Sequence, residues 1–299
     1  MKFSFTYLMK IKCFILILFF LSKAAFAQQA NSKPFVLGVI DEIQSIALAE
    51  KRILNIYLPE GYNKADTTRY PVVYLLDGSA DEDFIHVSGL FQFNSFPWIN
   101  RVPKSIIVGI ANVDRKRDFT YPTTVETDRK KLPTTGHSAE FISFLENELQ
   151  PFIEKNYKTN TSKMLIGQSL AGLLAAEVLI KKPALFNKYI IISPSLWWDK
   201  GSLLKQSSDI LGAKYSHRTD IYIGVGKEGL VSPVAAPGDA PHVMEVDANV
   251  FADKLKHGKS KNVHVYFDYL PEENHGTITH QAVFNALKLL YPLPKADHE

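Results

Sequence analysis

The chain has 299 residues, of which 46% are hydrophobic and 22% are charged, a balance typical of a globular protein and not of a disordered or fibrous one. Its single cysteine excludes a disulfide framework and a cysteine-rich zinc site within one chain. There are 34 lysines and arginines against 31 aspartates and glutamates, so the formal charge is +3.

The first 27 residues have the pattern of a removable export signal. Lys2, Lys10 and Lys12 precede the nine-residue apolar run Cys13–Leu21, and Ala25-Phe26-Ala27 forms a small-x-small cleavage pattern. The alternative is a membrane anchor, but a membrane-spanning helix needs about 20 apolar residues. Cleavage there would remove four lysines and no acid, leaving 30 bases, 31 acids, a net charge of −1 and no cysteine.

We therefore expect a periplasmic or secreted protein without a membrane anchor after signal cleavage. The expected segments are the signal at 1–27, a short lead-in at 28–34, one folded domain at 35–293 and a polar tail at 294–299. No internal repeat, low-complexity tract or linker divides the expected domain.

The first predicted strands form an antiparallel pair at a sheet edge, because Val36–Ile46 and Ile53–Leu58 alternate apolar and polar residues. Pro71–Leu76 is continuously apolar, which is typical of a strand buried on both faces. Similar runs predict further strands at Ser105–Ile110, Met164–Ile166, Tyr189–Ile192, Ile221–Val225 and Val263–Tyr269.

Apolar residues recur at helical spacing between these strands. The predicted helices cover Ser138–Tyr157, Leu170–Lys181, Ala248–Lys256 and His280–Leu290. Alternating strands and helices predict an α/β fold with a mostly parallel sheet covered on both faces. Two long segments, 111–136 and 228–243, are predicted to be loops near the carboxyl ends of strands, where such folds place their sites.

Gly167-Gln168-Ser169-Leu170-Ala171-Gly172 lies between a predicted strand and a predicted helix, which is the context of a nucleophile elbow. In this tight turn the residues around the serine must be small. Ala171 stands where the usual Gly-x-Ser-x-Gly pattern has glycine, and it is the smallest substitute. The predicted nucleophile is Ser169, with a helix N-cap serine as the alternative.

A serine hydroxyl becomes a good nucleophile only when a base removes its proton. Enzymes with such an elbow carry the acid and then the histidine later in the chain. His275 lies directly after the last predicted strand and before the last predicted helix, so it is the predicted base. His280 is the competitor, but it falls at the start of that helix.

The predicted acid is Glu228, in the turn that follows the strand at Ile221–Gly226. A carboxylate at this place would orient the histidine and stabilise its charged form. Asp239 and Asp247 remain alternatives.

The site also needs donors for the oxyanion that forms during acyl transfer. We expect one to be the backbone N–H of Leu170, and the second to come from Gly78 or Ser79, after the strand at Pro71–Leu76.

Several segments together resemble the "putative esterase" family of α/β-hydrolases, which includes esterase D and the enterochelin esterases. The resemblance runs from about Ile53 to Tyr291. The segments that carry it are Ile56-Tyr57-Leu58-Pro59, Tyr74-Leu75-Leu76-Asp77-Gly78, Val108-Gly109-Ile110 with Arg115–Asp118, Gly167–Gly172, and Ser193-Pro194-Ser195-Leu196-Trp197-Trp198-Asp199.

The resemblance implies an α/β-hydrolase fold in which Ser169 is the nucleophile and His275 the base, and it strengthens the choice of Glu228 as the acid. It also places two pairs of residues near the substrate. Trp197 and Trp198 are expected to border the pocket, with core packing as the alternative. Arg115 and Arg117 are expected either to bind substrate or to brace the long loop by pairing with Asp118.

The predicted function is an exported serine carboxylic ester hydrolase that forms an acyl-enzyme and needs no cofactor or metal. The expected partner is a small-molecule ester, for example a siderophore, feruloyl or acetyl ester. Nucleic acid is not expected, because the charge is near neutral without a basic stripe. The alternatives are an acyltransferase with the same nucleophile and a catalytically silent binding protein. The oligomeric state is not predicted.

Overall fold

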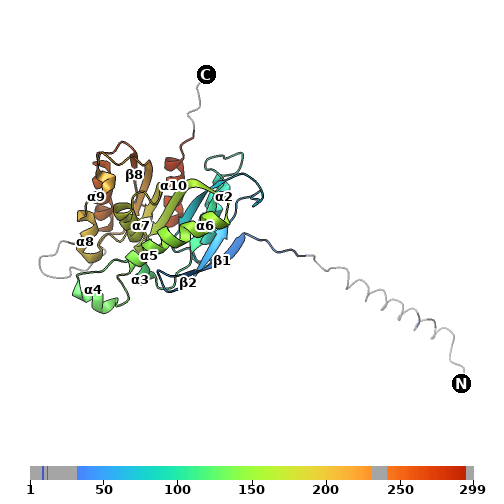
Figure 1. Cartoon of the computed structure of the whole chain (residues 1–299), viewed down its shortest axis with the longest axis horizontal. Helices are drawn as coiled ribbons and strands as arrows, with labels where there is room; N and C mark the ends of the chain where they lie inside the picture. Colours follow the sequence, from blue (N-terminus) through green and yellow to red (C-terminus); the bar gives the residue numbers. More distant parts are fainter. Residues whose placement is uncertain (1–8, 10–11, 13–31, 231–240, 294–299) are drawn as a thin grey trace, which may run out of the picture. The chain divides into compact units, whose positions relative to one another are not determined.

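Eight strands form one sheet in the computed structural model, which describes residues 32–230 and 241–293 together with residues 9 and 12 (Figure 1). Their order across the sheet is β1-β2-β4-β3-β5-β6-β7-β8. The strands are β1 (Gly38–Ser45), β2 (Glu50–Tyr57), β3 (Tyr70–Leu75), β4 (Ile106–Ile110), β5 (Thr159–Gln168), β6 (Lys188–Ile192), β7 (Thr219–Gly226) and β8 (Val263–Leu270).

The first two strands differ from the rest in direction. β1 pairs with β2 in antiparallel register from Gly38↔Tyr57 to Ser45↔Glu50, and β2 is also antiparallel to β4. From β4 to β8 all neighbours are parallel. The sheet therefore confirms the predicted class, a mostly parallel α/β fold with an antiparallel pair at its amino-terminal edge.

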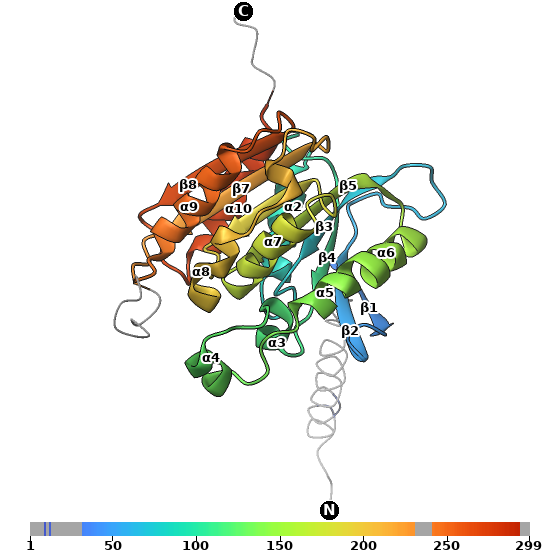
Figure 2. The same cartoon turned by 60° about the vertical axis from the view of Figure 1, so that its left-hand side comes forward.

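Helices cover both faces of the sheet (Figure 2). α2 (Phe84–Asn94) and α10 (Ile278–Leu290) pack against each other on one face, while α7 (Leu170–Lys181) and α9 (Met244–Lys256) lie on the other. Right-handed crossovers explain the faces of α2, α7 and α9, because β3 to β4 steps one way across the sheet and β5 to β8 steps the other way, while α10 follows the last strand.

The predicted helix at Ser138–Tyr157 contains a widened turn. It consists of α5 (Ser138–Phe144), a π-helical turn at Leu145–Leu149 and α6 (Gln150–Asn156). Pro151 lies at the start of α6. Its ring carries no N–H and crowds the carbonyl four residues earlier, so the chain widens there.

The structure corrects the prediction that 111–136 is an irregular loop. The segment contains α3 (Arg115–Phe119) and α4 (Glu126–Lys131). Asp118 of α3 is fully buried and pairs with Arg52 of β2 at 2.6 Å, which fastens the segment to the sheet. In the other long segment, residues 231–240 lie outside the described part, and an antiparallel bridge joins Leu230 to Val243.

Two further helices, α2 and α8, were not predicted from the sequence. α2 buries Phe84, Val87 and Phe91 but also exposes Ile85 and Phe93, so its apolar residues form no single stripe to recognise. α8 (Trp198–Lys205) contains backbone of positive φ from Asp199 to Gly201, which no helical periodicity indicates.

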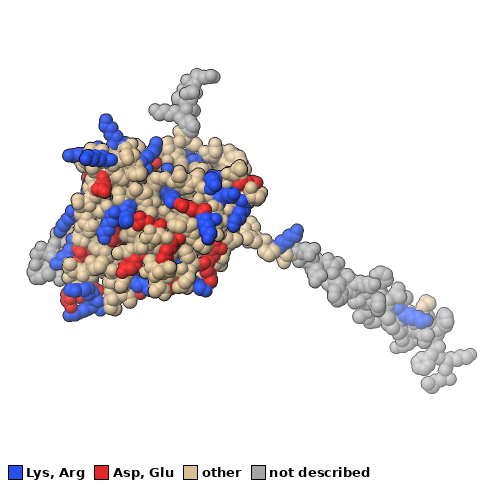
Figure 3. Space-filling model, viewed as in Figure 1, with Lys and Arg blue, Asp and Glu red and all other residues tan. Residues whose placement is uncertain are grey.

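The chain divides into the units Met1–Leu37 and Gly38–Glu299, and every labelled strand and helix belongs to the second. Most of the predicted signal, including Cys13, lies outside the described residues, as does the tail at 294–299. None of the described helices is long and apolar enough to cross a membrane. On the face shown in Figure 3, acidic and basic side chains are interspersed.

Candidate active site

Ser169 stands alone between β5 and α7 in a strained backbone conformation. Its φ is +61° and its ψ is −120°, a region that side-chain-bearing residues rarely adopt. The turn is tight because a Cβ at Gly167 would lie 2.4 Å from the carbonyl oxygen of Ala171. The Ser169 N–H donates to the carbonyl of Ile192 at 3.0 Å, which ties the turn to β6. This is the geometry of a nucleophile elbow.

His275 and Glu228 meet where the sequence placed them, after β8 and β7. Nδ1 of His275 lies 2.5 Å from Oε2 of Glu228. The Glu228 side chain is 2% exposed, whereas that of His275 is 45% exposed. Burial alone would raise the pKa of Glu228, but hydrogen bonds from His275 and Ser193 outweigh it, so that this pKa lies below its usual value. The carboxylate is therefore charged at neutral pH and holds a proton on Nδ1.

Ser169 and His275 line the same cavity, which has a volume of about 380 Å³. The hydroxyl oxygen of Ser169 is 3.5 Å from that of Ser195, whose N–H donates to the Ser169 carbonyl at 3.0 Å. The candidate nucleophile and the candidate base thus line one cavity. The residues that line this cavity are Ser169, Ser195, Trp197, Lys227, Glu228, Met244, Asn274 and His275.

Replacing Glu228 with glutamine is expected to lower kcat by about 10³- to 10⁴-fold, because an amide can hold the wrong tautomer of the histidine. Glutamine keeps the size of the side chain, so the fold should survive. Steady-state hydrolysis of a p-nitrophenyl ester, with circular dichroism as the folding control, measures the effect. A kcat within threefold of the wild-type value would show that Glu228 is not the acid of the site.

Gln168 is a site residue that the sequence reasoning did not single out. Its Nε2 donates to the carbonyl of His275 at 2.5 Å, and its Oε1 accepts a hydrogen bond from the hydroxyl of Thr279. Gln168, the residue before Ser169, thus holds the loop of His275 against the elbow. Its position next to Ser169 in Gly167-Gln168-Ser169 could have indicated a role in the site. Its partners, however, are more than 100 residues away in the chain.

The N–H groups of the three predicted oxyanion donors lie in different environments. Leu170 begins α7, so its N–H lies at the positive end of that helix dipole. The N–H of Gly78 donates to the carbonyl of Ile110 at 3.0 Å, so Gly78 is not a free donor. The N–H of Ser79 makes only a long hydrogen bond, 3.4 Å, to the carboxylate of Glu82.

Gly78 is instead needed for close packing between strand ends. A Cβ there would lie 2.4 Å from Cα of Gly109, at the end of β4.

The two adjacent tryptophans, Trp197 and Trp198, lie in different environments. Trp197 lines the cavity, whereas Trp198 is fully buried and its Nε1 donates to the carbonyl of Tyr121 at 2.8 Å. Trp198 therefore does not border the pocket, contrary to the expectation. It packs the α3–α4 segment against α8.

The two arginines brace the structure and line no part of the cavity. Arg115 makes two hydrogen bonds to Asp77, at 2.7 and 2.8 Å, and a third to the carbonyl of Gln168 at 3.2 Å. Arg117 pairs with Asp118 at 2.9 Å and with Glu50 at 2.5 Å. Both side chains thus have a bracing role, and the pairing with Asp118 holds for Arg117 alone, while substrate binding by either arginine stays a prediction.

Two of the competing residues, Asp247 and His280, lie outside the lining of this cavity. Asp247 contacts Nδ1 of His242 at 2.8 Å, and Asp239 lies outside the described residues. His280 contacts His86 at 3.0 Å. None of the residues placed by the structure competes with Glu228 or His275 for the cavity.

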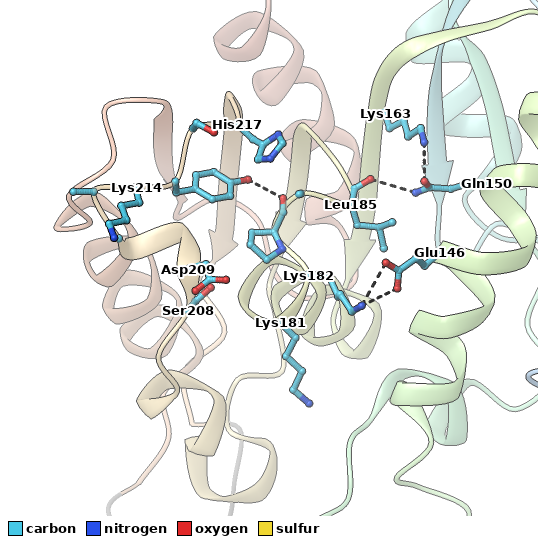
Figure 4. Close-up of a pocket in the computed structure, with 16 residues that line it drawn as sticks. Glu146, Gln150, Lys163, Lys181, Lys182, Leu185, Ser208, Asp209, Lys214 and His217 are labelled. Atoms are coloured by element: carbon cyan, nitrogen blue, oxygen red, sulfur yellow. Dashed lines mark hydrogen bonds and ion pairs between the residues drawn. The ribbon is translucent and has the colours of Figure 1, made fainter.

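A larger cavity, about 940 Å³, lies away from this chemistry (Figure 4). Its residues precede β5, β6 and β7 or lie near their amino ends, whereas the catalytic candidates follow carboxyl ends. Three of its lysines are already in ion pairs: Lys163 with Glu154, Lys181 with Glu177, and Lys182 with Glu146. We assign the chemistry to the smaller cavity.

The fold and the elbow define the class of the protein, a serine hydrolase of the α/β-hydrolase fold. The model of the family described as "Putative esterase" matches residues 45–267. The chain belongs to this family of ester hydrolases.

Solved structures agree with this placement. An IroE-like serine hydrolase from Shewanella oneidensis matches with a TM-score of 0.70 and 32% identity, over 85% of this chain and 80% of that one. Siderophore hydrolase EstA from Aspergillus nidulans shares the fold, with a TM-score of 0.68 at 18% identity over 88% of this chain and 97% of that one.

A curated relative matches over a shorter length. Ferri-bacillibactin esterase BesA of Bacillus subtilis is 30% identical over 187 residues, which are 58% of this chain and 64% of BesA. The match therefore spans less than two thirds of that relative.

Proposed function

We propose that the protein hydrolyses carboxylic esters through an acyl-enzyme on Ser169. His275 takes the hydroxyl proton as Ser169 Oγ bonds to the ester carbonyl carbon, and it then gives this proton to the departing alcohol. A water, deprotonated by His275, next attacks the acyl-enzyme, which releases the acid and returns the proton to Ser169. The N–H groups of Leu170 and Ser79 are the proposed oxyanion donors. The reaction needs no cofactor.

One observation carries this proposal: the His275–Glu228 pair, 2.5 Å apart, lines the same cavity as a serine in elbow conformation. A buried, charged carboxylate behind an exposed histidine is the arrangement that stabilises the imidazolium formed during catalysis.

The proposed substrates are siderophore esters, because relatives carry such activities in their names, including the ferri-bacillibactin esterase and an enterobactin esterase of Emericella nidulans that is 35% identical over 75 residues. The cavity supports an aromatic or anionic substrate, since Trp197 offers a ring and Lys227 a cation at its wall. Feruloyl and acetyl esters remain comparison substrates.

We also propose that the protein is exported, on the strength of the apolar run and cleavage pattern in residues 1–27. A small-molecule ester is the proposed partner, without nucleic acid. Amino-terminal sequencing of the protein from the native host tests the export: a mature chain that begins at Gln28 supports it, and an intact Met1 contradicts it.

A panel of esters tests the function. The purified protein is assayed with ferric and iron-free bacillibactin and enterobactin, methyl ferulate and p-nitrophenyl acetate. We expect hydrolysis of the siderophores with a kcat/KM at least tenfold above that for methyl ferulate. Equal or lower values would overturn the substrate class, hydrolysis of none of the esters would overturn the function, and acyl transfer to an added alcohol would favour a transferase.

A further inference from the structure

Ser193 lies directly after β6, fully buried beside the carboxyl end of β7. Its φ is +41°, a backbone conformation that favours glycine, yet the residue carries a hydroxyl. Its N–H donates to the carbonyl of Gly224 at 2.8 Å, and its hydroxyl donates to Oε1 of Glu228. Ser193 thus carries a side chain in a backbone conformation that favours glycine.

The two oxygens of Glu228 have separate partners. Oε2 faces Nδ1 of His275, while Oε1 accepts the Ser193 hydroxyl and a longer hydrogen bond of 3.3 Å from the N–H of Gly226. The last torsion of a glutamate is broad, so rotation of the carboxylate is weakly restricted by the side chain itself. Without Ser193, Oε1 would retain only the long hydrogen bond from Gly226.

We propose that Ser193 is a positioning residue of the active site, which holds the Glu228 carboxylate so that its second oxygen orients His275. The inference rests on the proposed function of Ser169, His275 and Glu228 and adds a fourth group to it. Ser193 does not touch the reacting atoms. It acts through the carboxylate.

Removal of the Ser193 hydroxyl should also change the titration of the Glu228 carboxylate. A hydrogen bond to a carboxylate favours its charged form, so loss of this donor raises the pKa of Glu228. The carboxylate signal of Glu228, followed by NMR, should therefore titrate at higher pH in Ser193→Gly than in wild type. Among the described residues, the titratable groups around Glu228 are His275, the adjacent Lys227 and Glu245 of α9, whose carboxylate accepts from the Glu228 N–H at 2.8 Å. None of these is changed in the test.

The test uses Ser193→Gly in the full chain, because glycine suits the positive φ and removes the hydroxyl. Loss of a hydrogen bond to a charged group should lower kcat by roughly 10- to 100-fold. KM should change by less than about threefold. Ser207→Gly, at an exposed serine, is the matched control. Thermal unfolding of both variants separates this loss from a loss of folded protein.

A double-mutant cycle separates positioning from a purely structural role. Because Ser193 acts through Glu228, Ser193→Gly should lower kcat by less than about twofold in a Glu228→Gln background. A full additional loss in that background, or an unchanged kcat in the single variant, would overturn the proposal.

Proton NMR of the His275 Nδ1–H tests the same contact without any turnover. The downfield signal of a proton shared with a carboxylate should shift in Ser193→Gly and vanish in Glu228→Gln, and a signal unchanged by Ser193→Gly would also overturn the proposal. If wild-type protein hydrolyses no ester, the proposed function fails, and this measurement still decides the role of Ser193.

Discussion

Ser169→Ala is expected to reduce kcat for ester hydrolysis by about 10⁵- to 10⁶-fold, the largest effect of any single change in this protein. Loss of the nucleophile removes the acyl-enzyme route altogether, so the remaining rate comes only from binding and oxyanion stabilisation. The backbone conformation at φ +61° suits alanine no worse than serine, so the elbow should keep its shape. Hydrolysis of p-nitrophenyl acetate by purified wild type and variant, at matched concentration, measures the ratio.

Two measurements make the result specific to this hydroxyl. Ser207→Ala, at an exposed serine far along the chain, should hydrolyse at the wild-type rate. A fluorophosphonate probe should label wild type at Ser169 and leave Ser169→Ala unlabelled, as found by peptide mass analysis. Equal rates for wild type and Ser169→Ala would exclude the proposed mechanism.

Asp118→Ala should destabilise the protein by about 3 to 5 kcal/mol, because it leaves the Arg52 guanidinium without its buried partner. Both side chains are at most 1% exposed, and their closest atoms are 2.6 Å apart. Arg52 Nε already lacks a hydrogen-bond partner among the described residues. Glu50 also contacts Arg52 but is 21% exposed, so it compensates only in part. Urea-induced unfolding, followed by tryptophan fluorescence, gives the free-energy change.

The comparison is an exposed ion pair in the same part of the sheet. Lys51 and Glu42 are 2.7 Å apart, but their side chains are 57% and 54% exposed, so Glu42→Ala should cost no more than about 1 kcal/mol. Arg52→Met combined with Asp118→Leu should recover much of the stability lost in Asp118→Ala, since both charges are then absent. A loss under about 1 kcal/mol in Asp118→Ala would show that the pair does not hold the α3 segment to the sheet.

The strands and the candidate triad could be predicted because their signals are local. A buried parallel strand is a continuous apolar run, and Ser169, Glu228 and His275 each directly follow such a run. Parallel strands end at one edge of a sheet, so residues after their carboxyl ends converge even when more than 100 positions separate them. The order of strands then follows from short, right-handed connections.

The roles of the polar side chains around the site could not be predicted in this way. Trp197 and Trp198 are adjacent and chemically identical, yet one lines the cavity and the other is buried against Tyr121. Arg115 and Arg117 have the charge of substrate-binding residues, but the acids that pair with them come from the turn after β3, from β2 and from α3. Each side chain's partner is decided by distant segments that the local sequence does not contain.

By itself, the sequence determined the fold class, the family and the positions of the candidate nucleophile, base and acid, because each depends on short patterns and on the order of elements. Only the tertiary structure decided that Gly78 packs against Gly109, that Gln168 holds the histidine loop and that Ser193 contacts Glu228. These are contacts between elements far apart in the chain. Their distances depend on how the strand ends and loops pack together, and composition and periodicity do not specify that packing.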